Sequence, residues 1–305
     1  MISSANPFAS AAGREILRAG GSAVDAAIAA QAVLTLVEPQ SSGIGGGAFL
    51  MHFRKSDGRV EAFDGRETAP AAIRPDVFVT VDGKPRSFRD ISTGGAAVGV
   101  PGILRMLALA HKEHGKLPWA RLFERAISHS ENGFPISPRL HAMIRRAKGL
   151  QNFPAAHAYF LTPEGTAKAV GTLLRNPLLA DTYRRLAAGG TEAFYSGDIA
   201  RDISAAVANA ARNPAMMTLG DIAGYQPKIR KPICRPYRTW RLCAMPPPTS
   251  GGLTTLQILG LLEGFDMARI PPSSVQAVHL ISEASRLAYA DRRRYIGDPD
   301  FVTVP

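Results

Sequence analysis

Residues 41–70 read SSGIGGGAFLMHFRKSDGRVEAFDGRETAP and combine a glycine run at residues 43–47 with an arginine at position 66. Glycine has no Cβ, so another group can approach the backbone closely along the run. A guanidinium offers five donors in a rigid fork and binds a carboxylate through two parallel bonds. The stretch therefore predicts a site for a small anionic substrate, with Arg66 as its cation.

The glycine run also fits a dinucleotide-binding pattern with alanine in the last place, at residues 43–48. That pattern needs a strand before it and a helix after it. Here residues 23–37 predict a helix before the run, and residues 48–53 predict a buried strand after it, so we reject a dinucleotide site. Two alternatives stay open: tight packing at the start of the strand, and a surface role for Arg66 paired with Glu67.

Helix-capping signals delimit the segments before the run. Asn6 followed by proline predicts the start of a first helix, and Ser22 with Asp25 resembles a capping box for a second, apolar and therefore buried helix. The expected helices occupy residues 7–19, 23–37, 101–114, 118–132, 138–148, 177–188, 197–212, 253–264 and 273–289. The expected strands occupy residues 48–53 and 59–63, joined by an Asp57-Gly58 turn, and a hairpin within residues 229–245.

Cys234 and Cys243 are the only cysteines. A two-residue turn at Arg238-Thr239 would place them opposite each other in the hairpin, within reach of a disulfide. We expect two free thiols, because nothing in the sequence fixes an oxidising compartment. Their number and spacing do not fit a zinc site.

The composition is that of a globular protein with a sizeable core. The chain has 305 residues, 46% hydrophobic and 20% charged. No apolar run reaches the 18 to 20 residues of a membrane helix, and no leader segment follows Met1. The net charge of +11 comes from scattered arginines without an aromatic-interleaved basic stripe. We therefore expect neither nucleic acid nor a membrane as partner.

The chain shows no complete catalytic machinery. The candidate nucleophiles lack a neighbouring base or lie within a predicted helix: Ser10, Ser41, Ser42, Thr254 and Thr255. The seven histidines form no metal-binding pattern, and His111 and His114 are expected to be solvated helix residues. The sequence thus predicts no catalytic residue, no metal and no cofactor in this chain.

Several segments nevertheless resemble one family, the γ-glutamyltranspeptidases or glutathione hydrolases. They run in the family's order along the whole chain, which is more specific than any single motif. The segments are ANP (5–7), ASAAG (9–13), GGSAVDAA (20–27), EP (38–39), SSGIGGG (41–47), RETAP (66–70), GVPG (99–102), ENGF (131–134), AFY (193–195), MTL (217–219), PPPTSGG (246–252), AYADR (288–292) and GDPDF (297–301).

The resemblance implies an α/β fold, part of the four-layer αββα sandwich of N-terminal-nucleophile hydrolases. In this family a precursor cleaves itself, and the threonine freed at the start of the small subunit attacks the γ-glutamyl carbonyl of glutathione or a related compound. The resemblance assigns Arg66 to the α-carboxylate of that substrate. Residues 1–305 then correspond to a single incomplete domain from the large subunit.

The chain stops at Pro305, before the expected threonine nucleophile, so we expect it to be inactive and poorly soluble without its small subunit. A related acylase, such as a cephalosporin acylase, is the alternative within enzymes. A non-catalytic fragment that binds a γ-glutamyl ligand or a separate small subunit is the alternative outside them. The family is usually periplasmic or secreted, but no signal segment is visible and the compartment stays open.

Overall fold

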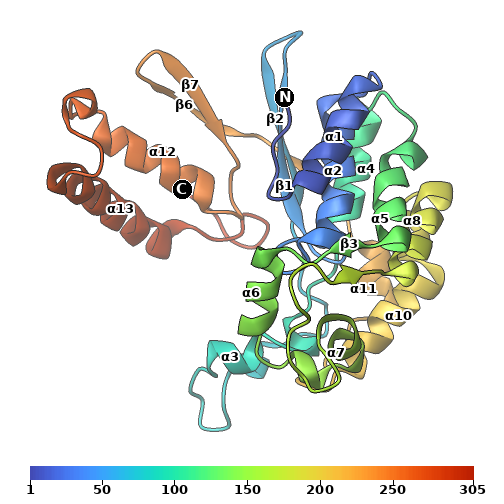
Figure 1. Cartoon of the computed structure of the whole chain (residues 1–305). Coiled ribbons are helices and arrows are strands. Elements are labelled where there is room, and N and C mark those ends of the chain that lie inside the picture. The colour runs from blue at the N-terminus through green and yellow to red at the C-terminus, as the bar shows by residue number, and fades with distance from the viewer. The chain divides into compact units, whose positions relative to one another are not determined.

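The computed structural model describes all 305 residues and divides them into two compact units (Figure 1). Unit 1 comprises Met1–Ala48 and Gly65–Pro227, and unit 2 comprises Phe49–Asp64 and Lys228–Pro305. The expectation that residues 1–305 form one incomplete domain stays a prediction. None of the helices combines the length and apolarity that crossing a bilayer requires.

Unit 1 is predominantly helical and contains a single short strand pair, β3 with β4. Its elements are α1 (Pro7–Arg18), α2 (Ala23–Val37), α3 (Phe88–Ile91), α4 (Ile103–His114), α5 (Glu124–Asn132), β3 (Phe134–Pro135), α6 (Pro138–Arg146), α7 (Pro154–Phe160), β4 (Leu173–Leu174), α8 (Pro177–Gly189), α9 (Glu192–Tyr195), α10 (Gly197–Ala208) and α11 (Leu219–Gly224).

The first two helices begin at their predicted caps. The Asn6 side chain accepts a hydrogen bond from the backbone N–H of Phe8 at 3.0 Å. Ser22 Oγ accepts from Asp25 N at 3.1 Å, and Asp25 Oδ2 accepts from Ser22 N at 2.8 Å, so the capping box is confirmed. Ten of the 15 residues of α2 are buried, which confirms the buried helix predicted from its apolar sequence.

Asp25 also fixes the loop that follows α4. The same oxygen, Oδ2, accepts from Lys116 N at 2.9 Å and Leu117 N at 3.2 Å. His111 Nε2 lies 2.9 Å from the Leu117 carbonyl and 3.5 Å from Asp25 Oδ1, and its ring packs edge-on against Trp119. The expectation that His111 is a solvated residue is therefore wrong, because the loop folds back over it.

The helix expected over residues 118–132 is divided. Trp119–Phe123 forms a 3₁₀ turn, and α5 begins only at Glu124. In that turn the Arg121 N–H bonds to the Pro118 carbonyl, and the Trp119 and Phe123 rings pack edge-on at 5.0 Å. The sequence periodicity predicted an α-helix here, but the segment in which the two aromatic rings pack forms the tighter 3₁₀ turn.

Unit 2 combines small sheets with two helices. Its elements are β1 (Ala48–Arg54), β2 (Arg59–Gly65), β5 (Lys228–Arg230), β6 (Ile233–Tyr237), β7 (Trp240–Ala244), α12 (Gly251–Leu262) and α13 (Val275–Tyr295). One sheet has the order β1-β2-β5, with β2 and β5 antiparallel and Phe63 opposite Ile229. The β6–β7 hairpin contacts α12, and α12 packs against α13.

The β6–β7 hairpin has the predicted register. Tyr237 pairs with Trp240 and Cys234 with Cys243, and Arg238 in the turn has a φ of 53°. A disulfide joins the two cysteines, whose Cα atoms are 4.1 Å apart. The expectation of two free thiols is therefore wrong, because directly opposed positions of an antiparallel pair bring the two sulfurs within bonding distance.

The strand after the glycine run is less buried than predicted. In β1 the side chains of Met51 and Phe53 are exposed, with Phe53 at 62%. β1 lies at the edge of its sheet, and the outward face of an edge strand is buried only where another element covers it. The prediction of a strand at this position is confirmed, but the prediction that it is buried is wrong.

Candidate functional site

The glycine run lies between the end of α2 and the start of β1, in the helix-then-strand order that argued against a dinucleotide site. Within it, Gly47 is packed tightly: a Cβ there would lie 2.5 Å from Glu67 Oε2 and 2.6 Å from the Gly65 carbonyl. A Cβ on Gly45 would meet nothing within 4 Å. The tight packing predicted at the start of the strand is therefore present at Gly47, whereas the backbone at Gly45 faces open space.

Arg66 follows β2 directly, and 62% of its side chain is exposed. Its Nε lies 3.4 Å from Glu67 Oε2, so the pairing considered as a surface alternative is present. One oxygen of the Glu67 carboxylate, Oε2, is buried beside Gly47, while the side chain as a whole is 28% exposed. An exposed guanidinium beside a half-buried carboxylate suits the capture of an anion, because a guanidinium has five N–H donors and can bind more than one carboxylate.

Backbone hydrogen bonds join three segments beneath Arg66. The Val100 N–H bonds to the Thr68 carbonyl at 2.8 Å, and the Gly102 N–H bonds to the Gly46 carbonyl at 3.0 Å. The segment around Arg66 is thereby tied to residues 99–102, which in turn hold the glycine run. Backbone hydrogen bonds thus join these three stretches next to the arginine.

A tyrosine that the sequence analysis did not single out also contacts these segments. Tyr225 is 5% exposed, and its hydroxyl donates a hydrogen bond to the Arg66 carbonyl at 2.8 Å. It lies directly after α11, a helix that the periodicity did not predict. No local pattern marks Tyr225, because its partner is 159 residues away in sequence.

Unit 1 also contains an apolar cavity of about 370 Å³ whose wall includes Gly45. Val98 and Pro101 line it next to the Thr68–Val100 bridge, and α10 supplies the opposite wall. The open side of the glycine run therefore faces apolar surface. Such a surface suits an uncharged group rather than a second anion.

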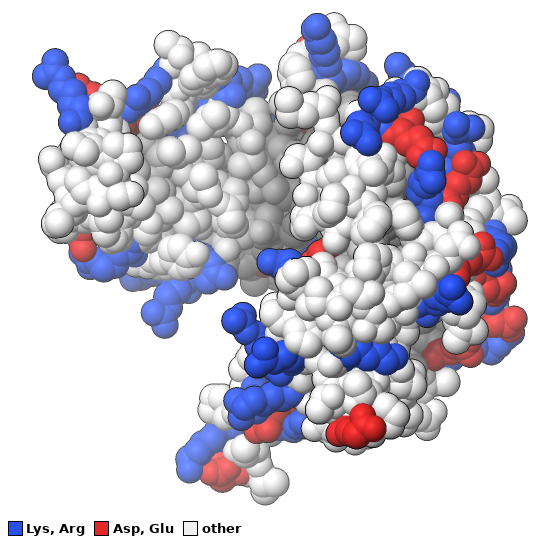
Figure 2. All heavy atoms as spheres, in the orientation of Figure 1, with Lys and Arg blue, Asp and Glu red and all other residues white.

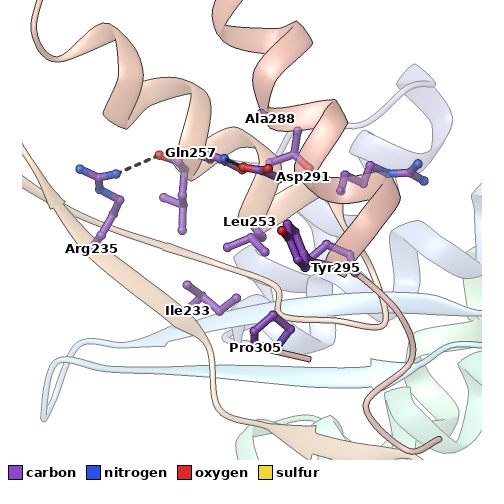
Figure 3. A pocket seen from close by; sticks show the side chains of 12 residues that line it. Ile233, Arg235, Leu253, Gln257, Ala288, Asp291, Tyr295 and Pro305 are labelled. Carbon is purple, nitrogen blue, oxygen red and sulfur yellow. Dashed lines mark hydrogen bonds between the residues drawn. The ribbon is translucent and has the colours of Figure 1, made fainter. Parts of the chain in front are cut away.

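A second cavity, of about 360 Å³, lies in unit 2 between the β6–β7 hairpin and α12 and α13 (Figure 3). Its polar side chains already bond within the protein: Gln257 to Asp291, and Arg235 to the Leu256 carbonyl and to Glu263. Thr254, one of the rejected nucleophiles, lines it and is buried within α12. The lining includes no histidine and no cysteine, so it brings no nucleophile–base pair together.

The charged side chains form no continuous basic stripe on the face seen in Figure 2. Blue Lys and Arg side chains are interspersed with red Asp and Glu, or stand singly on the white surface. Many are paired with close neighbours, as are Arg74 with Asp76 and Arg125 with Glu15. This pattern agrees with the solvated arginine surface expected from the scattered charge.

Comparison with known families matches residues 9–305 to the family described as gamma-glutamyltranspeptidase. The glutathione hydrolase proenzyme of Bacillus subtilis is 37% identical over 305 residues, which cover all of this chain and 51% of that protein. An acylase ACY 1 proenzyme of Pseudomonas sp. strain V22 is also 37% identical, over 311 residues that cover all of this chain and 55% of that protein. The chain thus spans about half the length of the curated relatives it matches.

The crystal structure of Helicobacter pylori gamma-glutamyltranspeptidase superposes on this chain with a TM-score of 0.93 at 33% identity. The match covers 99% of this chain and 86% of that one. It confirms the expected mixed α/β fold, the helix-rich portion of an N-terminal-nucleophile hydrolase sandwich.

Proposed function

Because this chain belongs to the gamma-glutamyltranspeptidase family, we propose that it contributes the carboxylate-binding half of a γ-glutamyl-transferring active site. The observation that supports this is Arg66: its guanidinium is exposed, while its backbone is held by Tyr225 and its neighbours by residues 99–102. A bidentate guanidinium–carboxylate pair would fix the α-carboxylate of glutathione or another γ-glutamyl compound at this point.

The proposed reaction is an acyl transfer from the γ-carboxamide. A threonine hydroxyl, supplied by the small subunit that corresponds to the part of the relatives outside this chain, attacks the γ-carbonyl carbon. The C–N bond breaks, the amine leaves with a proton, and a glutamyl ester remains on the threonine. Water or an amine then attacks the ester, which releases the glutamyl group and restores the hydroxyl.

Arg66 acts on a carboxylate several bonds from the reacting carbonyl, so its bond persists unchanged from the bound substrate to the transition state. Interactions of that kind strengthen substrate capture without lowering the chemical barrier. In the complete enzyme, Arg66→Ala should therefore raise KM by one to two orders of magnitude, about 1.4–2.8 kcal/mol, with a smaller change in kcat. An unchanged KM would contradict the assignment.

A chromogenic γ-glutamyl anilide tests whether the chain is catalytic by itself. The proposal expects no steady release of the anilide, since the nucleophile belongs to the small subunit. Steady turnover by the purified chain would overturn that part of the proposal.

Arg66 can be tested in the chain alone by NMR, which detects millimolar binding. Addition of glutathione should shift the Arg66 Nε–H resonance, and the analogue γ-aminobutyryl-cysteinyl-glycine, which lacks the α-carboxylate, should not. Arg74→Ala is the matched control, because Arg74 is also exposed in unit 1 and lies 3.3 Å from its neighbour Asp76. Binding that survives Arg66→Ala as well as it survives Arg74→Ala would refute the role of Arg66.

An acylase is the second candidate, because the Pseudomonas acylase proenzyme is as similar to this chain as the Bacillus glutathione hydrolase. A glutaryl amide keeps the terminal carboxylate of a γ-glutamyl amide but lacks its amino group. In the complete enzyme, preference for the glutaryl anilide over the γ-glutamyl anilide would favour the acylase, and the reverse would favour γ-glutamyl transfer.

A further inference from the structure

We infer that Tyr225 is a positioning residue for Arg66, and this inference rests on the proposed carboxylate-binding role of that arginine. The Tyr225 hydroxyl donates to the Arg66 carbonyl at 2.8 Å, on the residue whose side chain would meet the substrate. Tyr225 is 5% exposed, so the donor of this hydrogen bond comes from a buried residue. The hydroxyl thereby fixes the peptide plane from which the Arg66 side chain leaves.

Tyr225 itself is held from behind by Arg105. The Arg105 Nη1 donates to the Tyr225 carbonyl at 2.5 Å and to the Ala223 carbonyl at 2.8 Å, and Nη2 bonds to Glu192 at 3.0 Å. The guanidinium also lies over the Tyr195 ring, 4.2 Å from its centroid. A side chain with this many bonds has one orientation, so the position of Tyr225 is determined by α4 and α9.

Tyr195 connects Tyr225 to the segment of residues 99–102, which lies next to Arg66. Its ring stacks on Tyr225, with centroids 6.3 Å apart, and its hydroxyl donates to the Pro101 carbonyl at 2.9 Å. Burial raises the pKa of Tyr195 to about 12, so the hydroxyl keeps its proton at neutral pH. The two tyrosines therefore hold the Arg66 carbonyl on one side and the Pro101 carbonyl on the other.

Gly102 packs closely against the Tyr225 hydroxyl, with no room for a Cβ between them. A Cβ on Gly102 would collide with the Tyr225 hydroxyl and with the Gly65 carbonyl. The hydroxyl occupies the space that a side chain would take, directly beside the residue that precedes Arg66. Gly102→Ala should therefore displace the Tyr225 hydroxyl and, through the Gly65 carbonyl, the backbone that leads into Arg66.

The test compares Tyr225→Phe with a matched variant, Tyr183→Phe. Tyr183 is also buried in unit 1, and its hydroxyl also donates to a backbone carbonyl, that of Ala32, at 2.8 Å. Both variants lose a tyrosine hydroxyl and its hydrogen bond to a backbone carbonyl, so both should lower stability. Only Tyr225→Phe should change the position of the Arg66 backbone and, with it, the orientation of the Arg66 side chain.

The first readout is made in the chain without ligand, on the Arg66 carbonyl ¹³C and Nε–H resonances. We expect both to shift in Tyr225→Phe and in Gly102→Ala, and to stay in place in Tyr183→Phe. Unchanged Arg66 resonances in Tyr225→Phe, or equal shifts in the Tyr183 variant, would overturn the inference.

The second readout is the affinity for glutathione, which should weaken about three- to ten-fold in Tyr225→Phe and not in Tyr183→Phe. In the complete enzyme the loss should appear in KM rather than kcat. Equal affinities of the two variants would overturn the inference. If wild-type Arg66 does not respond to glutathione, the proposed function fails, whereas the ligand-free resonances still decide the role of Tyr225.

Discussion

Helix α2 in unit 1 and helix α13 in unit 2 differ in how many of their residues are buried. Ten of the 15 residues of α2 are buried in unit 1, where α1, α4 and α5 pack around it. In α13 three of 21 residues are buried, all of them alanines, while Val275 and Val278 are 88% and 57% exposed. Burial depends on the elements available to face a helix, so apolar content predicts it only where those elements are present.

One buried carboxylate in each unit also differs from the other in its hydrogen-bond partners. In unit 1 the buried carboxylate of Asp25 is bonded mainly to backbone N–H groups of its own loop and of the loop after α4. In unit 2 the buried carboxylate of Asp64 is bonded to a side chain, Arg230, which also holds Asp300. These two buried carboxylates are thus held in different ways: Asp25 mainly by backbone N–H groups, and Asp64 by the guanidinium of Arg230.

The largest effect is expected from Asp25→Ala in unit 1. The change leaves three partly buried N–H groups without their acceptor, which should lower the free energy of unfolding by about 3–5 kcal/mol. Urea unfolding followed by Trp119 fluorescence in a Trp240→Phe background reports on this unit, because the chain has one tryptophan in each unit. Asp181→Ala, an exposed position on α8, is the control, and an equal effect there would contradict the comparison.

A smaller loss should follow Arg230→Met in unit 2. It leaves the buried Asp64 carboxylate without the guanidinium whose Nε lies 2.6 Å away, at a cost of about 2–4 kcal/mol. The measurement is hydrogen exchange of the β2 and β5 amides. The control is Arg241→Met, which replaces an exposed arginine of β7 in the same unit. Equally fast exchange of the β2 and β5 amides in that control would show that the effect does not depend on the ion pair with Asp64.

Acid should weaken the ion pairs around Arg230 in a defined range. Hydrogen bonds from Arg230 and Lys228 lower the pKa of Asp300 from 3.8 to about 2. A carboxyl group whose pKa is lower in the folded state stabilises that state above about pH 4, and this stabilisation of about 1–2 kcal/mol is lost as the pH falls from 4 through 2. The urea concentration at which β5 amide cross-peaks disappear should therefore be lower at pH 2.5 than at pH 4.5.

Asp300→Asn provides the control for this pH effect. The asparagine does not titrate, so the difference between the two pH values should become smaller in the variant. A difference of the same size in wild type and variant would assign the acid sensitivity to other carboxylates.

The smallest effect on stability is expected from Val278→Ser on α13. The side chain is already exposed, so the free energy of unfolding should change by less than about 0.5 kcal/mol. Self-association should nevertheless fall, because exposed apolar surface drives it. Gel filtration at several concentrations measures this, and a wild-type chain that stays monomeric throughout would contradict the expected poor solubility.

Local features were predictable from the sequence. The caps of α1 and α2 and the register of the β6–β7 hairpin depend on residues within a few positions of each other, and the structure confirms them. The end of α13 was placed six residues early, at Tyr289 instead of Tyr295. A run of three arginines continues that helix, since arginine is a good helix former and its charge suits the last turn.

Contacts between distant segments were not predictable. Arg66 was identified as a cation from its type and its neighbours, but nothing near it in sequence indicates Tyr225 or Arg105. The disulfide was missed for a different reason: the register was predicted, but oxidation was judged from the compartment and not from the geometry. Local chemistry thus identified the arginine of the candidate site, and only the folded chain identifies what holds it.

The hydrogen bond from Tyr225 to Arg66 also sets an order of events in time. Its acceptor is made 159 residues before its donor. At about 5–20 residues per second, the ribosome adds Tyr225 roughly 8–32 seconds after Arg66. During that interval the Arg66 carbonyl has no Tyr225 hydroxyl to bond with. The orientation of Arg66, the proposed carboxylate-binding residue, is therefore among the last features of unit 1 to be fixed during synthesis.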